Sequence, residues 1–138
     1  MFSIDHVSIS VADAQKSVEF YKALDFTESN SYEAPDGSLK IIMLKDKNGA
    51  MLELFCHSAP SKAPEHTHDH ITDLSVIGVK HFGLRVDSLE RAVDALIRKG
   101  FADVINISEG RLGRNYFFIK DPNGILLEII ESGTEGNV

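Results

Sequence analysis

Two histidines and two glutamates are the residues of this sequence whose types and spacing most favour site chemistry. His6 and His81 lie 75 positions apart, and so do Glu53 and Glu128. Each glutamate interrupts an apolar stretch that is typical of a buried strand. A carboxylate there is costly unless it is ion-paired or bound to a metal. The four residues are therefore candidates for metal binding. The alternative is that the histidines are only partly buried and that the glutamates are paired with Lys or Arg.

The 75-residue spacing extends along the chain and indicates a duplicated module. When residues 1–63 are compared without gaps with the residues 75 positions later, ten are identical, against roughly four expected by chance. The first-copy positions are His6, Val11, Val18, Phe26, Lys45, Asp46, Asn48, Gly49, Leu52 and Glu53. Both copies contain an Asp-x-Asn-Gly turn before the glutamate strand, at 46–49 and 121–124.

Each copy has the pattern strand, helix, strand, strand, strand. Residues 4–11 alternate polar with apolar, and His6 lies on the polar face. Asp13 and Ser88 are suitable N-caps for the helices that follow. Three more strands are expected in each copy, at about 26–34, 38–45 and 50–56, and then at 101–108, 114–120 and 125–131. The predicted fold class is α+β with two tandem βαβββ modules.

The bulk composition excludes some partners. The 138 residues carry a net charge of −7 without a Lys/Arg cluster, so neither nucleic acid nor an anionic membrane surface is expected. Cys56 is the single cysteine, which fits a reducing compartment. No apolar run has the length of a membrane span, and the start does not look like a signal peptide. We expect a cytoplasmic protein.

The predicted boundaries are a first module at 1–57, a linker at 58–77, a second module at 78–131 and a frayed tail at 132–138, all within one domain spanning 1–138. The linker is rich in His, Pro, Ser, Thr and Asp. His66, His68 and His70 alternate within it. A solvated loop is favoured over a metal-responsive lid at these histidines.

The order of these motifs resembles that of the glyoxalase, or vicinal oxygen chelate, superfamily. The resemblance spans 1–131 and depends on Asp5-His6-Val7-Ser8-Ile9-Ser10-Val11, Leu52-Glu53-Leu54, Lys80-His81-Phe82-Gly83-Leu84, and Asp121-Pro122-Asn123-Gly124 followed by Leu127-Glu128. It implies a curved eight-stranded mixed sheet, a homodimer, and one divalent metal ion held by His6, Glu53, His81 and Glu128 of one chain. Two imidazoles and two carboxylates would leave such an ion formally neutral and an octahedral site with two open positions.

The ligand set is most similar to that of lactoylglutathione lyase. This similarity implies a nickel, cobalt or zinc enzyme that acts on a small substrate with vicinal oxygens, or on its thiol adduct, through a stabilised enediolate. Glu128 is the preferred proton shuttle, with Glu53 retained on the metal. The alternatives are a ring-cleaving dioxygenase using iron or manganese, an epimerase, and a drug-binding protein like the bleomycin-resistance members.

Strand alternation also predicts the surroundings of the site. Met51 and Phe55 share the face of Glu53, and Leu126 and Ile130 share that of Glu128. Phe118 is a further candidate, with Tyr116. Arg85 follows His81 by four positions on the same face and could hold a substrate carboxylate or pair with Asp87. In the glyoxalase group such an arginine often follows the first histidine, where this chain has Ser10, so glutathione as the thiol is in question.

Overall fold

The computed structural model describes residues 1–133, and the predicted tail lies outside the described residues from 134 onward. The chain divides into two compact units. The first contains Met1–Glu65 together with Asp121–Asn123, and the second contains His66–Lys120 and the residues from Gly124. None of the helices in residues 1–133 has the length and apolar character needed to cross a membrane.

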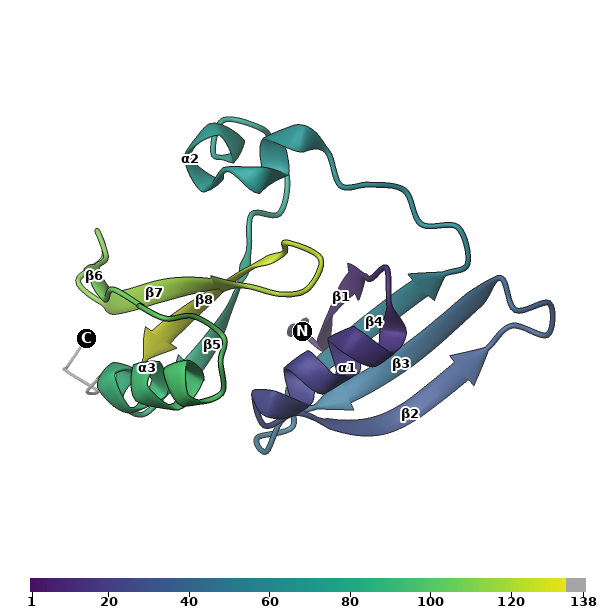
Figure 1. Cartoon of the computed structure of the whole chain (residues 1–138), viewed down its shortest axis with the longest axis horizontal. Coiled ribbons are helices and arrows are strands. Elements are labelled where there is room, and N and C mark those ends of the chain that lie inside the picture. Colours follow the sequence, from purple (N-terminus) through teal and green to yellow (C-terminus); the bar gives the residue numbers. More distant parts are fainter. Residues whose placement is uncertain (134–138) are drawn as a thin grey trace. The chain divides into compact units, whose positions relative to one another are not determined.

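The first unit is a four-stranded mixed sheet with one helix (Figure 1). Its strand order is β1-β4-β3-β2. Strand β1 pairs in parallel with β4, and β4, β3 and β2 pair antiparallel. The elements are β1 (His6–Ser10), α1 (Ala14–Ala23), β2 (Thr27–Glu33), β3 (Leu39–Lys45) and β4 (Met51–His57).

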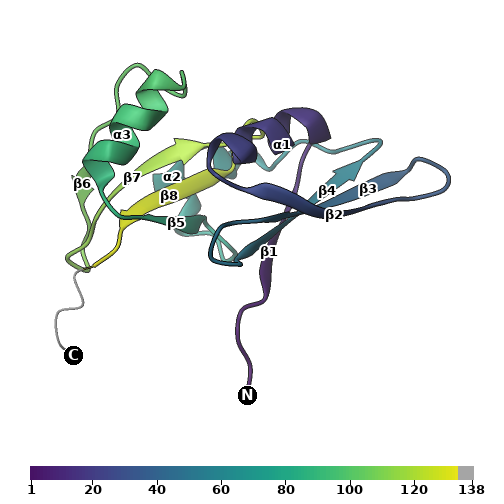
Figure 2. The ribbon, with the colours of Figure 1, turned by 90° about the horizontal axis from the view of Figure 1, so that it is seen from below.

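Alternation along β4 separates the core from the opposite face of this sheet. Leu52 and Leu54 are buried, whereas Met51, Glu53 and Phe55 are only partly covered. Helix α1 lies on one face of the sheet (Figure 2) and begins at the predicted N-cap, where the Asp13 side chain accepts from the Lys16 amide. Glu53 therefore lies on the face of the sheet opposite to the buried leucines.

The tip of the β7–β8 hairpin belongs to the first unit because it is bonded to α1 and the residue before its N-cap. The buried Tyr21 hydroxyl donates to Asp121 Oδ2 at 3.1 Å. Asn123 accepts from the Ala12 amide at 2.9 Å and donates to the buried Ser17 hydroxyl at 3.2 Å. Burial raises the pKa of Tyr21, and the neighbouring Asp121 carboxylate raises it further, so the phenol stays a donor.

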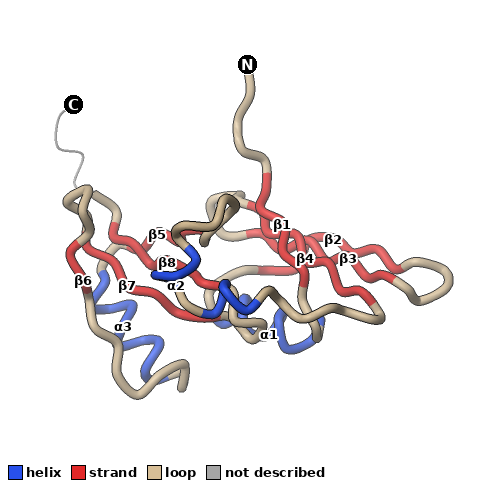
Figure 3. The backbone as a smooth tube through the Cα atoms, turned by 90° about the horizontal axis from the view of Figure 1, so that it is seen from above, coloured by secondary structure: helices blue, strands red, loops and turns tan. Residues whose placement is uncertain are grey.

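The second unit repeats the sheet with the order β5-β8-β7-β6. Strand β5 pairs in parallel with β8, and the others pair antiparallel. Helix α3 begins at the predicted Ser88 cap, and α3 and α2 lie on opposite faces of this sheet (Figures 1 and 3). The elements are η1 (Glu65–His68), α2 (His70–Asp73), β5 (Phe82–Val86), α3 (Leu89–Arg98), β6 (Ser108–Glu109), β7 (Asn115–Lys120) and β8 (Leu126–Glu131).

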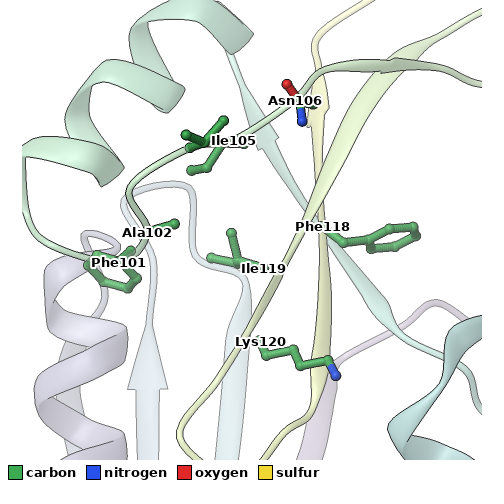
Figure 4. Close-up of a pocket in the computed structure, with 8 residues that line it drawn as sticks. Phe101, Ala102, Ile105, Asn106, Phe118, Ile119 and Lys120 are labelled. Atoms are coloured by element: carbon green, nitrogen blue, oxygen red, sulfur yellow. The ribbon is translucent and has the colours of Figure 1, made fainter.

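The strand predicted at 101–108 is wrong, because only Ser108–Glu109 pairs with β7. Asp103 breaks the alternation of apolar residues, and Val104 is 72% exposed, so this segment has no continuous apolar face to bury. In place of the missing ladder, residues 101–106 and β7 line a pocket of about 300 Å³ (Figure 4). The rest of the predicted α+β class, with two βαβββ modules, is confirmed. Its strands are hydrogen-bonded as two four-stranded sheets.

The predicted linker contains two short helical turns, so the solvated-loop interpretation of its histidines is only partly correct. His66 Nδ1 lies 2.8 Å from Asp73 Oδ1. Lys80 Nζ lies 3.1 Å from the other oxygen of the same buried carboxylate, and Lys120 donates to the His68 carbonyl oxygen at 3.1 Å. The first two bonds hold residues 66–80 together, and the third joins them to β7 within the second unit.

Candidate metal centre

The first unit brings His6 and Glu53 together on adjacent parallel strands. In the register of β1 and β4, Glu53 lies opposite Ser8, and His6 precedes Ser8 by two positions on the same face. The resulting distance from His6 Nε2 to Glu53 Oε2 is 3.2 Å. Both side chains keep some exposure, 37% for His6 and 18% for Glu53. The pair is therefore accessible to a small ion or molecule.

Asp5 orients the His6 ring. Its Oδ2 lies 2.8 Å from His6 Nδ1, so the carboxylate accepts a hydrogen bond from a protonated Nδ1 and leaves Nε2 as the ring nitrogen that faces Glu53. This hydrogen bond is the main reason why the pKa of His6 is raised above its usual value. A carboxylate behind a histidine is the common support of metal-ligating imidazoles, where it fixes the tautomer and makes the nitrogen more basic.

Ser8 supports the glutamate of the same pair. Its hydroxyl donates to Glu53 Oε2 at 2.7 Å. This is the same oxygen that faces His6 Nε2. The hydroxyl therefore fixes the orientation of the carboxylate beside the imidazole, and no lysine or arginine is its partner among the ion pairs of residues 1–133.

The second unit forms a corresponding pair from His81 and Glu128. His81 directly precedes β5, and its Nε2 lies 3.4 Å from Glu128 Oε2. The exposures, 27% for His81 and 24% for Glu128, are similar to those of the first pair. At the positions that correspond to Asp5 and Ser8, however, this unit has Lys80 and Gly83. Within residues 1–133, His81 Nδ1 is buried without a hydrogen-bond partner.

An aromatic cluster surrounds His81, and the sequence analysis missed one member of it. The Phe118 ring lies 5.2 Å from that of His81, in edge contact. His70 of the linker lies 4.8 Å from Phe118 and 5.9 Å from His81. The alternating histidines of the linker were the available signal for His70, but sequence spacing cannot show that α2 returns to this face of the sheet.

The predicted surroundings lie on the expected faces. Phe118 is the cross-strand partner of Glu128, and its ring points away from Ile105 and Ala102 (Figure 4). Met51 and Phe55 are half-buried on either side of Glu53. Arg85 is exposed two positions after Gly83, and in residues 1–133 it forms no ion pair with Asp87 or any other acid. Its guanidinium is available to an anionic ligand.

Each pair has donor atoms that fit a divalent cation. Ligand bonds of about 2.1 Å at angles between about 90° and 110° would separate two ligand atoms by about 3.0–3.4 Å. The nitrogen–oxygen distances of 3.2 and 3.4 Å agree with that range. Over residues 1–133, no group of three or more His, Cys, Asp or Glu side chains is arranged to hold a metal ion. Each unit by itself supplies one imidazole and one carboxylate.

Two βαβββ modules, each with a histidine at its first strand and a glutamate in its last, define a class of duplicated α+β proteins. Residues 3–129 match the profile of the Glyoxalase/Bleomycin resistance protein/Dioxygenase superfamily, and the chain belongs to this family. Among curated relatives, it is 31% identical over 132 residues to the uncharacterized protein YwkD of Bacillus subtilis strain 168, covering 94% of this chain and 96% of that protein.

Solved structures share the fold. A glyoxalase family protein from Enterococcus faecalis has a TM-score of 0.75 at 23% identity, with 94% of this chain and 97% of that chain covered. The trypanothione-dependent glyoxalase I of Leishmania major has a TM-score of 0.68 at 20% identity, with 95% and 87% covered. At such identities the similarity establishes the fold alone.

Proposed function

We propose that the protein is a metal-dependent lyase or isomerase of the lactoylglutathione lyase type. The observation that carries this proposal is that each module places an imidazole nitrogen and a carboxylate oxygen 3.2 or 3.4 Å apart on one face of its sheet. Family membership fits the proposal but includes other activities. The residues that would hold one divalent ion, nickel, cobalt or zinc, are His6, Glu53, His81 and Glu128 of a single chain.

The ion would polarise two vicinal oxygens of a small substrate and so acidify the adjacent C–H bond. Glu128 then accepts the proton from one carbon and returns it to the neighbouring carbon, so that no atom is gained or lost. Glu53 stays in place as a ligand. Phe118 lies beside Glu128 as its cross-strand partner, and Met51 and Phe55 flank Glu53.

Arg85 is the proposed recognition group for the non-reacting end of the substrate. It lies on β5, on the same face as Gly83 and next to the glutamate strand. An unpaired guanidinium binds carboxylates in a bidentate manner. The substrate class that fits is therefore a thiol adduct of a small aldehyde in which the thiol carries a carboxylate.

Metal reconstitution followed by a substrate panel tests this function. The metal-free protein is titrated with nickel, cobalt and zinc, and each form is assayed with methylglyoxal and several thiols. Turnover that requires both a metal and a thiol is expected. If no combination is turned over, the lyase proposal is wrong. Oxygen uptake by the iron-loaded protein with catechols would instead indicate a dioxygenase, and absence of metal affinity would indicate a binding protein.

The association state is a separate part of the proposal. We propose a homodimer, as the family resemblance implies, in which each chain supplies a complete set of ligands. A cytoplasmic location is proposed from the single cysteine, Cys56. Sedimentation of the metal-loaded protein measures the mass in solution. A monomer at micromolar concentration would contradict the dimer without affecting the assignment of ligands.

A further inference from the structure

The two His–Glu pairs have the same geometry but different support. In the first, Ser8 donates to Glu53 Oε2 at 2.7 Å and Asp5 binds His6 Nδ1 at 2.8 Å. In the second, the corresponding residues are Gly83 and Lys80. Lys80 is turned toward the linker, where its Nζ lies 3.1 Å from Asp73. Neither residue can give the second pair the support that the first pair has.

The Ser8 hydroxyl restrains rotation of the Glu53 carboxylate, because its oxygen partner is also the oxygen that faces the imidazole. A glutamate held in this way is suited to remain bound to a metal and is poorly suited to carry a proton between two atoms.

Gly83 leaves the corresponding space beside Glu128 empty of any side chain. A Cβ atom built at Gly83 would lie 3.8 Å from Glu128 Oε2 and 3.8 Å from the Glu128 carbonyl oxygen. Both are ordinary van der Waals contacts, so a Cβ atom fits at this position without displacing its neighbours. The position next to the Glu128 carboxylate therefore lacks a side chain because the residue is glycine, and crowding by its neighbours does not require a glycine there.

We propose that Ser8 is a positioning residue that fixes Glu53 as a permanent metal ligand, and that Gly83 leaves Glu128 free to turn and move the proton. The first pair is then the anchoring half of the site and the second is the mobile half. This inference rests on the proposed function for the role of Glu128, whereas the role of Ser8 is a statement about metal binding alone.

Exchanging the two residues tests the proposal. Co²⁺ affinity and the cobalt absorption spectrum are measured for Ser8→Ala, Ser8→Thr, Gly83→Ser and the control Ser10→Ala, which removes an exposed hydroxyl from the same strand and face. We expect Ser8→Ala to weaken Co²⁺ binding about tenfold and to change the spectrum. Ser8→Thr, which keeps the hydroxyl, and Ser10→Ala should stay within about twofold of the parent.

Gly83→Ser gives the complementary result. Because the new hydroxyl can bind the Glu128 carboxylate, we expect Co²⁺ affinity to be unchanged or tighter, while kcat falls on the order of tenfold at an unchanged KM. The proposal is overturned if Ser8→Ala binds Co²⁺ as the parent does, or if Gly83→Ser leaves kcat unchanged. Circular dichroism confirms that each variant is folded.

Failure of the proposed function would look different. A parent protein that binds Co²⁺ but turns over no substrate removes the lyase assignment and the proton-transfer role of Glu128. The contrast between Ser8→Ala and Ser8→Thr in Co²⁺ affinity still decides the positioning role of Ser8, because it needs no substrate.

Discussion

The two modules share the strands that carry the ligands and differ at their outer strands. In each module the histidine strand pairs in parallel with the glutamate strand, over five residue pairs in both cases. The outer strand β2 pairs with β3 from Thr27 to Glu33, with one register shift between Glu28 and Asn30, whereas its counterpart β6 has two residues. The two modules therefore have the same strand pairing at the candidate site and differ at the outer strands β2 and β6.

The physical reason is that each glutamate strand, β4 or β8, lies between two neighbouring strands and buries one of its faces. Leu52 and Leu54 in β4, like Leu127 and Ile129 in β8, are buried, so a register shift would bring apolar residues to the site and glutamate into the core. Strand β6 has one neighbour, and the segment before it has no continuous apolar face to bury, so this segment can unpair at lower cost than β4 or β8. The comparison predicts that the two ligand pairs contribute similarly to metal binding and that their supports contribute differently.

The largest expected effects come from removing the histidines. His6→Ala and His81→Ala should each weaken nickel or cobalt binding at least about 100-fold, because each removes one imidazole ligand. Calorimetric titration of the metal-free protein measures the affinity. His57→Ala, at an exposed histidine at the end of β4, is the matched control and should bind as the parent does. A large effect of only one of the two substitutions would break the equivalence of the modules.

Mixing two inactive chains shows whether the equivalent pairs serve one ion within one chain. A His6→Ala chain and a Glu128→Ala chain are unfolded together, refolded and assayed with metal. We expect no recovery of metal-dependent turnover, since each proposed site contains a defect. Recovered activity would mean that the ligands are shared between subunits, and it would leave the four ligands themselves unaffected.

The support of the first pair gives the next effect in size. Asp5→Asn removes the carboxylate that orients His6, and we expect metal affinity to fall about 10- to 100-fold. The matched change is Lys80→Ala, at the corresponding position before His81, which should leave affinity within about twofold. If both variants bind equally, Asp5 is an exposed acid without influence on the site.

The sequence contained enough to predict the modules and the pairs, because duplication made each weak signal appear twice. Helix caps at Asp13 and Ser88 and the alternation around Glu53 and Glu128 are local patterns, and the structure has them as predicted. The hydrogen bond from Ser8 to Glu53 depends on strand register, which links residues 45 positions apart. The position of His70 depends on how the linker folds back, and no periodicity in the sequence reports it.

The bond between Tyr21 and Asp121 gives a smaller effect on stability. Leu96 stands at the position corresponding to Tyr21 and has no hydroxyl, so the two helices differ here as well. Tyr21→Phe leaves a buried carboxylate with one donor fewer, and we expect the free energy of unfolding to fall by about 1 kcal/mol. Tyr32→Phe, at a residue that is 53% exposed, should change it by less than about 0.5 kcal/mol. Urea denaturation measures both.

The smallest effect concerns the helical turns at the end of the linker, where residues 66–77 belong to the second unit. The hydrogen bond from His66 and then the bond from Lys80 hold the pKa of Asp73 below its ordinary value of 3.8, and the Thr72 and Ile71 amides do the same for Asp69. An acid whose pKa is lower in the folded protein contributes stability above its unfolded pKa and loses it as the pH falls through the folded value. We therefore expect the amides of residues 65–80 to keep their protection from neutral pH down to about pH 4 and to lose it below. Hydrogen exchange, corrected for the intrinsic rate, measures this protection.

Asp73→Asn should reduce the protection already at neutral pH, and the acid dependence that remains is then due to Asp69. The control Asp103→Asn, at an exposed position of the same unit, should match the parent throughout. Protection that is independent of pH below 4 in the parent would show that these carboxylates do not hold the linker.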